Sequence, residues 1–258
     1  MMSKPVKVRL STNATGSGVN AASYVPSFRY PSLHDALSII QPGDFIAIGD
    51  IKQYYMAFPF ATEAYYNFGV EIANKVYYYA TLFFGYGPGA YFASFWSAEI
   101  RQWVLAEGVQ SAHVMDDWLT RGTTSARATA DMAVVRSKVV QGGWEWQDGK
   151  DICGQQVVYL GVLIDSVTMT LRFDQDVCAL MSAELTEWVT LLSRGGDMEK
   201  QEIVRVCGKL GWLGSPLQSA PIRTWAWWRY AIHGKALFPA VRRQLLRDSQ
   251  WWITHLNQ

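Results

Sequence analysis

The chain has 258 residues, of which 50% are hydrophobic and 17% are charged. This composition excludes general disorder, and the length is sufficient to bury a sizeable core. The net charge of +1 is unevenly distributed, because residues 194–258 hold 10 of the 23 Lys and Arg but only 4 of the 22 Asp and Glu. The rear part is therefore basic and the front part acidic, which favours a nucleic-acid contact on the rear part.

The cysteines and the N-terminus indicate the compartment. Cys153, Cys178 and Cys207 are far apart and form no CxxC pair, which argues against a disulfide framework or a zinc knuckle. The first seven residues lack the apolar core of a secretory signal, so we expect an intracellular protein of the cytoplasm or nucleus, not a secreted one. Residues 76–96 carry no charge, but three glycines and a proline interrupt them, so we expect no membrane span.

The first two thirds of the chain alternate between strand and helix patterns, after a turn-rich opening over residues 11–18. In chain order the patterns predict a helix over 31–40, a buried strand over 45–51, two strands within 68–84 joined around 73–75, a helix over 89–106, a strand pair over 112–119, a helix over 126–140 and a strand over 157–164. This order is typical of a mixed α+β domain.

From about residue 175 onward the pattern is purely helical. One predicted helix presents apolar residues at helical spacing: Met181, Leu185, Trp188 and Leu192. Residues 194–196 are expected to end this helix, and Asp197 is a predicted N-cap of the next. The inner positions of that next helix are Ile203, Val206 and Leu210. The boundary between the mixed part and the helical part is expected near Phe173.

The first candidate for chemistry is the segment Val114-Met115-Asp116-Asp117, whose neighbours on both sides are apolar. Two adjacent carboxylates within a hydrophobic strand pair are costly unless something compensates their charge. A hairpin tip that presents them to a divalent cation is one solution. A solvated turn is the other, since Asp is common in turns. The segment alone leaves both interpretations open.

A second acid, Asp50, lies at the end of the strand predicted over 45–51. If this strand neighbours the strand pair, Asp50 and Asp116 converge at one edge of the sheet. Carboxylates about 4 Å apart repel each other, and a pair of Mg²⁺ ions can bridge them. Two such metals are typical of in-line phosphoryl transfer, in which one activates the attacking oxygen and the other stabilises the leaving oxygen.

Several segments, in this order along the chain, resemble motifs of the reverse transcriptases. They are residues 7–10, 50–59, 82–86, 114–117, 143–150 and 159–161. Residues 114–117 are similar to the Tyr-x-Asp-Asp box, although Val114 replaces the tyrosine. Three stretches, 30–36, 159–171 and 247–253, are similar to the DIRS-like group of tyrosine-recombinase retrotransposons.

The resemblance implies an α+β right-hand polymerase fold, in which an antiparallel palm sheet is flanked by helices and joined by partial fingers and a helical thumb. The implied domains are partial fingers at 1–48, a palm at 49–173 with a fingers-side hairpin at about 62–81, and a helical thumb or connection at 174–258. No RNase H domain is expected. The implied activity is that of an RNA-directed DNA polymerase, a nucleotidyltransferase that extends a primer.

The resemblance also implies partners, cofactors and site residues. The partners would be an RNA or DNA template–primer and dNTPs, and the cofactors two Mg²⁺ ions, which Mn²⁺ can replace. The catalytic residues would be Asp50, Asp116 and Asp117, with the carbonyl of Ile51 as a further metal ligand. Nucleotide binding would involve Lys7, Arg9, Tyr55, Gly85 and Lys150. The primer grip would be Tyr159, Leu160 and Gly161, and the template–primer contacts Arg205, Lys209, Arg223 and Arg229.

Structural roles stay open for individual residues and for the chain. Tyr55, which would exclude a ribose 2′-hydroxyl, is alternatively a core aromatic. The basic residues are alternatively solvated cations, and the glycines at 85, 87 and 89 a plain turn. The whole chain is alternatively a domesticated or inactive module that binds nucleic acid or has a structural role. A further alternative is an RNA-templated RNA polymerase, against which the bulky Tyr55 argues. Exposed apolar surface is compatible with a homo-oligomer.

Overall fold

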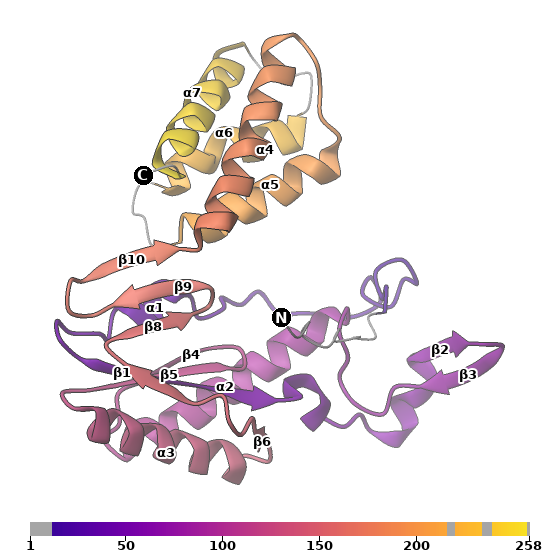
Figure 1. Cartoon of the computed structure of the whole chain (residues 1–258). Coiled ribbons are helices and arrows are strands. Elements are labelled where there is room, and N and C mark those ends of the chain that lie inside the picture. Colours follow the sequence, from indigo (N-terminus) through magenta and orange to yellow (C-terminus); the bar gives the residue numbers. More distant parts are fainter. Residues whose placement is uncertain (1–11, 216–219, 234–238, 257–258) are drawn as a thin grey trace. The chain divides into compact units, whose positions relative to one another are not determined.

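The computed structural model describes residues 12–215, 220–233 and 239–256. The chain divides into two units, each with its own hydrophobic core (Figure 1). The first contains the described residues up to Val157 together with Ser166–Thr168, and the second contains Val158–Asp165 and the described residues from Met169 onward. Lys7 and Arg9 lie outside the described residues. None of the helices in the described part has the length and hydropathy that crossing a bilayer requires.

An antiparallel sheet forms the framework of the first unit (Figure 1). Its strands follow the order β4-β5-β1-β6, and β7 also pairs with β1. Their bounds are β1 Phe45–Lys52, β4 Ser111–Val114, β5 Asp117–Gly122, β6 Glu145–Trp146 and β7 Ile152–Gly154. Because Ile46 and Ala47 are both buried and successive residues point to opposite faces, β1 is covered on both faces. This burial explains its continuous apolar run.

Two helices pack against each other and against the sheet: α2 (Gly87–Ala106) and α3 (Ser125–Gln141). Pro88 lies in the first turn of α2, where its missing N–H removes no helical hydrogen bond. Thr124 caps α3 by accepting a hydrogen bond from the Arg127 N–H. Ile100 and Val135 are fully buried beside Trp118 of the sheet. The predicted helices over 89–106 and 126–140 are confirmed.

The first unit also contains an exposed hairpin. It consists of β2 (Gly69–Ile72) and β3 (Lys75–Tyr78), as predicted within residues 68–84. The turn residues Ala73 and Asn74 both have positive φ, 51° and 59°, which a type I′ turn requires. All four β3 residues are exposed, and the hairpin extends away from the sheet in Figure 1. Two short 3₁₀ helices precede it, Tyr54–Ala57 and Thr62–Asn67.

The helix predicted over 31–40 is shorter in the structure, where α1 spans Leu33–Leu37. Ser32 and Asp35 form a capping box: the Ser32 hydroxyl accepts from the Asp35 N–H, and the Asp35 carboxylate accepts from the Ser32 N–H. The capping box fixes the first helical residue as Leu33, so Pro31 lies before the helix.

The single strand predicted over 157–164 is wrong. The segment forms two strands, β8 (Gln156–Tyr159) and β9 (Val162–Asp165), and β10 (Thr170–Phe173) completes a sheet of order β10-β9-β8. The chain reverses at Leu160 and Gly161, whose φ angles are 51° and 77°. Glycine accepts such a φ without strain, but the apolar residues around it obscure the turn in the sequence.

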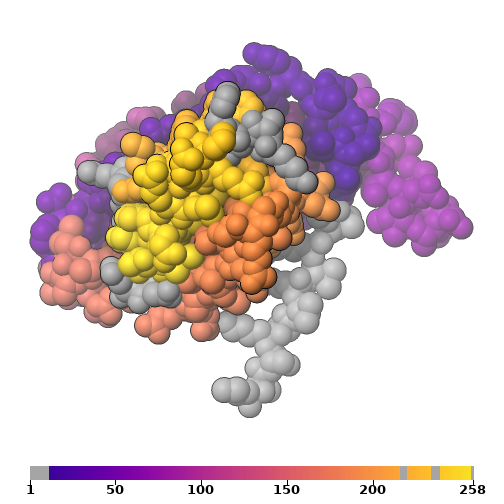
Figure 2. Space-filling view, turned by 90° about the horizontal axis from the view of Figure 1, so that it is seen from above, coloured from indigo at the N-terminus to yellow at the C-terminus, as the bar shows by residue number. Residues whose placement is uncertain are grey.

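Four helices form the core of the second unit: α4 (Gln175–Ser193), α5 (Lys200–Leu213), α6 (Ala220–His233) and α7 (Pro239–Leu256). The apolar face predicted on α4 is buried, as are the predicted inner positions of α5. Trp227 and Trp252 are almost completely buried in the same core. Figure 2 shows α7 in yellow beside α4 in orange, in agreement with their direct packing.

The predicted helix cap at Asp197 is wrong. Helix α5 begins at Lys200, and its N-cap residue, Glu199, makes no side-chain cap bond. The carboxylate of Asp197 instead accepts a hydrogen bond from the Tyr230 hydroxyl of α6. Because Met198 is buried in the core, the segment between the two helices is fixed by tertiary packing and not by a local cap.

Candidate active site

The strands next to the predicted acidic residues are neighbours: Asp50 lies on β1, and Asp116 lies in the turn directly before β5. β1 and β5 pair antiparallel, with Asp50 directly opposite Asp117. The Ile51 N–H donates a hydrogen bond of 3.0 Å to the main-chain oxygen of Asp116, which fixes the end of β1 against the β4–β5 hairpin. Met115 and Asp116 form the two-residue turn of that hairpin, and Met115 has a φ of 56°. Asp116 is therefore held at the tip, next to the end of β1.

The charges of these acids interact. Burial and, to a smaller extent, the nearby carboxylates of Asp116 and Asp50 together raise the pKa of Asp117 to about 6, against the opposing charge of Lys150. One oxygen of Asp50, Oδ2, forms an ion pair with Lys150. The other, Oδ1, is buried and has no hydrogen-bond partner among the described residues. A buried carboxylate oxygen without a partner is costly, so this position favours a cation.

Oxygen ligands of this kind suit Mg²⁺ or Mn²⁺. The part of the chain that the structure describes contains no group of three or more His, Cys, Asp or Glu arranged to hold a metal ion. The residues that fit such an ion here are Asp50, through its unpartnered oxygen, and Asp116, with Ile51 directly following Asp50 on β1. The predicted ligand set of Asp50, Asp116, Asp117 and the Ile51 carbonyl stays a prediction.

An aromatic cluster borders the acids. Tyr55 is half-buried, and its ring makes an edge contact with Phe84, with centroids 5.3 Å apart. Burial raises the pKa of Tyr55 to about 12, with smaller effects of Tyr30 and Asp116 in the same direction, so Tyr55 lies near the acids. The hydroxyl of its neighbour Tyr54 is hydrogen-bonded to the Ser97 hydroxyl at 2.8 Å, so the Tyr54 side chain is part of the buried core.

One residue of this cluster was not predicted. Trp144 donates its indole N–H to the main-chain oxygen of Tyr54 over 2.8 Å and stacks on the Tyr54 ring. It therefore supports the segment that carries Tyr55. Its position within the motif-like segment 143–150 is a sequence signal for this role.

Gly85 lies in a turn that packs against the protein itself. Its φ is 101°, and a Cβ at this position would lie 2.0 Å from the main-chain oxygen of Thr12. The Asn20 side chain also donates a hydrogen bond of 2.9 Å to the Gly85 carbonyl. The close approach of backbone explains why glycine is needed here, and the nucleotide-binding role of Gly85 stays a prediction.

The predicted primer-grip residues belong to the second unit. Tyr159 is 2% exposed at the end of β8, and Leu160 and Gly161 form the β8–β9 turn. A Cβ on Gly161 would lie 3.2 Å from the Trp212 ring, so this turn packs closely on α5. The turn is thus packed against the helical part of the second unit, and its contact with a primer stays a prediction.

The predicted template–primer residues are largely paired within the second unit. Arg205 and Lys209 both pair with Glu184 of α4. Arg223 pairs with the fully buried Asp248 at 2.9 Å, and the guanidinium of Arg229 lies 5.9 Å from the Trp225 ring centroid. These four residues therefore also make contacts within the helical unit.

Comparison with known proteins supports the fold. No family model and no curated protein matches the chain. A solved foamy viral protease–reverse transcriptase dRH in complex with double-stranded DNA matches 99% of this chain and 42% of its own, with a TM-score of 0.66 and 12% identity. A foamy viral protease–reverse transcriptase with double-stranded DNA matches 99% of this chain and 50% of its own, with a TM-score of 0.59 and 12% identity. With an RNA/DNA hybrid, the match covers 94% of this chain and 31% of the other, with a TM-score of 0.55 and 12% identity.

This chain thus spans half or less of the length of these neighbours. At such low identity the similarity concerns the fold. The mixed helices and antiparallel sheet form the α+β palm-like fold of reverse transcriptases, and the predicted fold class is confirmed.

Proposed function

We propose that the chain is the polymerase part of an RNA-directed DNA polymerase, a nucleotidyltransferase that extends a primer on an RNA or DNA template with dNTPs. The observation that carries this proposal is the convergence of Asp50, Asp116 and Asp117 at the end of β1 and the β4–β5 hairpin, on a palm-like fold. The solved neighbours were captured with double-stranded DNA or an RNA/DNA hybrid, which supports a template–primer as the partner.

Asp50 and Asp116, with the Ile51 carbonyl, would hold two Mg²⁺ ions or Mn²⁺ in their place. When bound, these ions would activate the primer 3′-hydroxyl and stabilise the leaving pyrophosphate. Asp117 would add negative charge beside the two primary ligands.

Two further side chains would act on the incoming nucleotide. Tyr55, held against Phe84, would lie under the sugar, where its ring leaves no room for a 2′-hydroxyl. Lys150 would leave Asp50 when a cation takes its place and would then neutralise the triphosphate. Gly85 would allow close approach of the backbone to the nucleotide.

The proposal extends to the origin of the chain. Residues 30–36, 159–171 and 247–253 resemble the DIRS-like group, so we assign the chain to a retroelement of that kind. The competing function is an inactive module that binds template–primer without extending it. The unpartnered Oδ1 of Asp50 favours the enzyme, because binding of a template–primer alone does not require a position for a cation there.

The test is primer extension on an RNA template with dNTPs and Mg²⁺ or Mn²⁺. We compare the parent with Asp116→Asn and with a matched control, Asp176→Asn, which changes an exposed aspartate in the first turn of α4. The parent and the control should extend the primer, and Asp116→Asn should lose at least about a thousandfold in rate. If the parent and Asp116→Asn both bind template–primer equally and neither extends it, the inactive module is the correct function.

A further inference from the structure

A pocket of about 370 Å³ lies in the first unit, apart from the acidic residues. It is bordered by α1 and the segment before it, by α2, and by the edge strand β4. Its polar lining consists of Arg29, Tyr30, Asp35, Ser38, Arg101 and His113. None of the residues predicted to bind a metal, a nucleotide or a primer lines it, so it requires its own explanation.

His113 is the most informative residue of this lining. It is only 4% exposed, and its ring stacks on Trp118 with centroids 4.8 Å apart. Neither ring nitrogen has a hydrogen-bond partner among the described residues. Burial, with a smaller effect of Arg101, lowers the pKa of His113 to about 4, so the neutral ring retains one N–H to donate. A buried donor without an acceptor is costly, and an acceptor bound in the pocket would relieve this cost.

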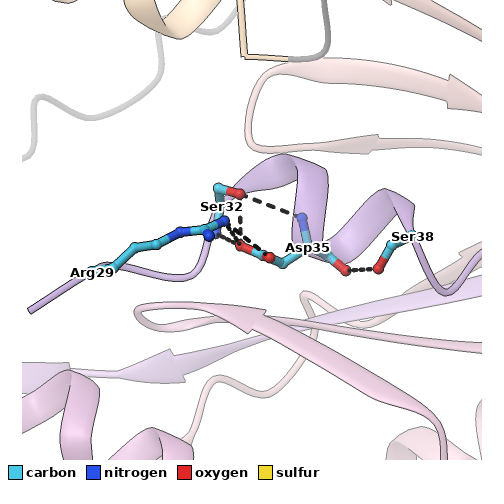
Figure 3. A network of polar contacts seen from close by, with 4 residues as sticks. All are labelled: Arg29, Ser32, Asp35 and Ser38. Carbon is cyan, nitrogen blue, oxygen red and sulfur yellow. Dashed lines mark hydrogen bonds and ion pairs between the residues drawn. The ribbon is translucent and has the colours of Figure 1, made fainter. Parts of the chain in front are cut away.

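The charges around the pocket favour an anion. Asp35 is the one acid in the lining, and it accepts hydrogen bonds from the Ser32 N–H and hydroxyl, both at 2.7 Å, and from Arg29 at 3.2 Å (Figure 3). The Arg29 guanidinium therefore neutralises the carboxylate. Arg101 donates through Nε to the Ser111 main-chain oxygen at 2.8 Å and has no carboxylate partner among the described residues. The lining thus keeps one uncompensated positive charge beside His113.

We propose that this pocket binds a phosphate group, which the Arg101 guanidinium and the His113 N–H hold at the base of the pocket. A phosphate offers several acceptor oxygens to a guanidinium and to further donors at once. The volume also suits a ligand the size of a mononucleotide. The phosphate belongs either to a free mononucleotide or to the backbone of a nucleic acid. The site does not depend on the proposed polymerase activity.

The first test is calorimetric titration of the whole chain with AMP and with a dT oligonucleotide, in chelator so that no divalent cation recruits phosphate to the acids. Arg101→Gln removes the uncompensated charge, and His113→Phe removes the N–H while keeping a ring on Trp118. The matched control, Arg136→Gln, changes an exposed arginine that pairs with Asp148 outside this pocket. Both pocket variants should weaken binding at least about tenfold, and the control should leave it within about twofold.

The outcomes separate the sources of the phosphate. If only AMP binding is weakened, the ligand is a free nucleotide, and if only the oligonucleotide is affected, the ligand is a backbone phosphate. If His113→Phe remains folded and binds both probes as the parent does, the proposal is overturned. It is also overturned if Asp116→Asn abolishes binding or if Arg136→Gln weakens it as much as Arg101→Gln. Primer extension by Asp116→Asn tests the proposed function independently.

Discussion

Asp50 and Asp117 lie directly opposite each other in the antiparallel pair of β1 and β5. Like charges at directly opposite positions destabilise a strand pair. Here burial, followed by the charges of Asp116 and Asp50, raises the pKa of Asp117 to about 6. The end of an otherwise apolar strand therefore carries a concentration of negative charge that packing alone does not require.

The first prediction concerns the stability that a divalent cation supplies. With Mn²⁺ at about a hundred times its dissociation constant, the free energy of unfolding of the parent should rise by about 2.7 kcal/mol. Asp50→Asn and Asp116→Asn should lose most of this gain, and the exposed control Asp176→Asn should keep it. Thermal unfolding with and without Mn²⁺ measures the difference. Equal stabilisation of the parent and both site variants would place the cation elsewhere.

The second prediction concerns selection of the sugar. Replacing Tyr55 with Ala removes the half-buried ring beside Phe84 and should raise incorporation of ribonucleotides relative to deoxynucleotides by roughly ten- to a hundredfold. Single-nucleotide primer extension with rNTPs and dNTPs measures the ratio. Tyr66→Ala is the control, because Tyr66 is 81% exposed. An unchanged ratio in Tyr55→Ala would assign Tyr55 to the core alone.

The third prediction concerns the close backbone approach at Gly85. Gly85→Ala should lower the free energy of unfolding by about 3 kcal/mol, because the new Cβ meets the Thr12 carbonyl oxygen in addition to the strain of a positive φ. Gly143 is the matched control, since its φ is 95° but no atom lies within 4 Å of its added Cβ. Gly143→Ala should cost only about 1 kcal/mol. Urea unfolding measures both, and equal losses would rule out the contact with Thr12.

The fourth prediction concerns pH. The folded state depresses the pKa of His113 to about 4, whereas the unfolded chain has the ordinary value of about 6.5. The contribution of the neutral His113 ring to the free energy of unfolding is therefore complete above pH 6.5. It is lost as the pH falls towards 4, because His113 takes up a proton in the unfolded chain before it does so in the folded protein. Between pH 6.5 and pH 4, the free energy of unfolding of the parent should fall by about 3 kcal/mol more than that of His113→Gln.

Urea unfolding at several pH values measures this loss. His255→Gln, which changes an exposed histidine of α7, should follow the parent. A parallel pH dependence of the parent and His113→Gln would show that the buried histidine does not control acid stability.

Much of the fold could be predicted because burial leaves a direct mark on the sequence. β1 is covered on both faces and is therefore apolar from Phe45 to Gly49, and the acid that ends this run, Asp50, marked the candidate site. The turn at Leu160 and Gly161 could not be predicted, since the neighbours of that single glycine are all apolar. The ion pair of Lys150 with Asp50 joins residues 100 positions apart, so no local pattern reports it.

This ion pair has a consequence for the order in which the protein is assembled. Because Lys150 supplies a positive charge to Asp50 from within the chain, the acidic end of β1 can form before any metal arrives. Folding and cation binding are then separate events. During folding, the Lys150 ammonium supplies the positive charge beside Asp50 that a cation would supply later. The chain should accordingly refold in the presence of a chelator.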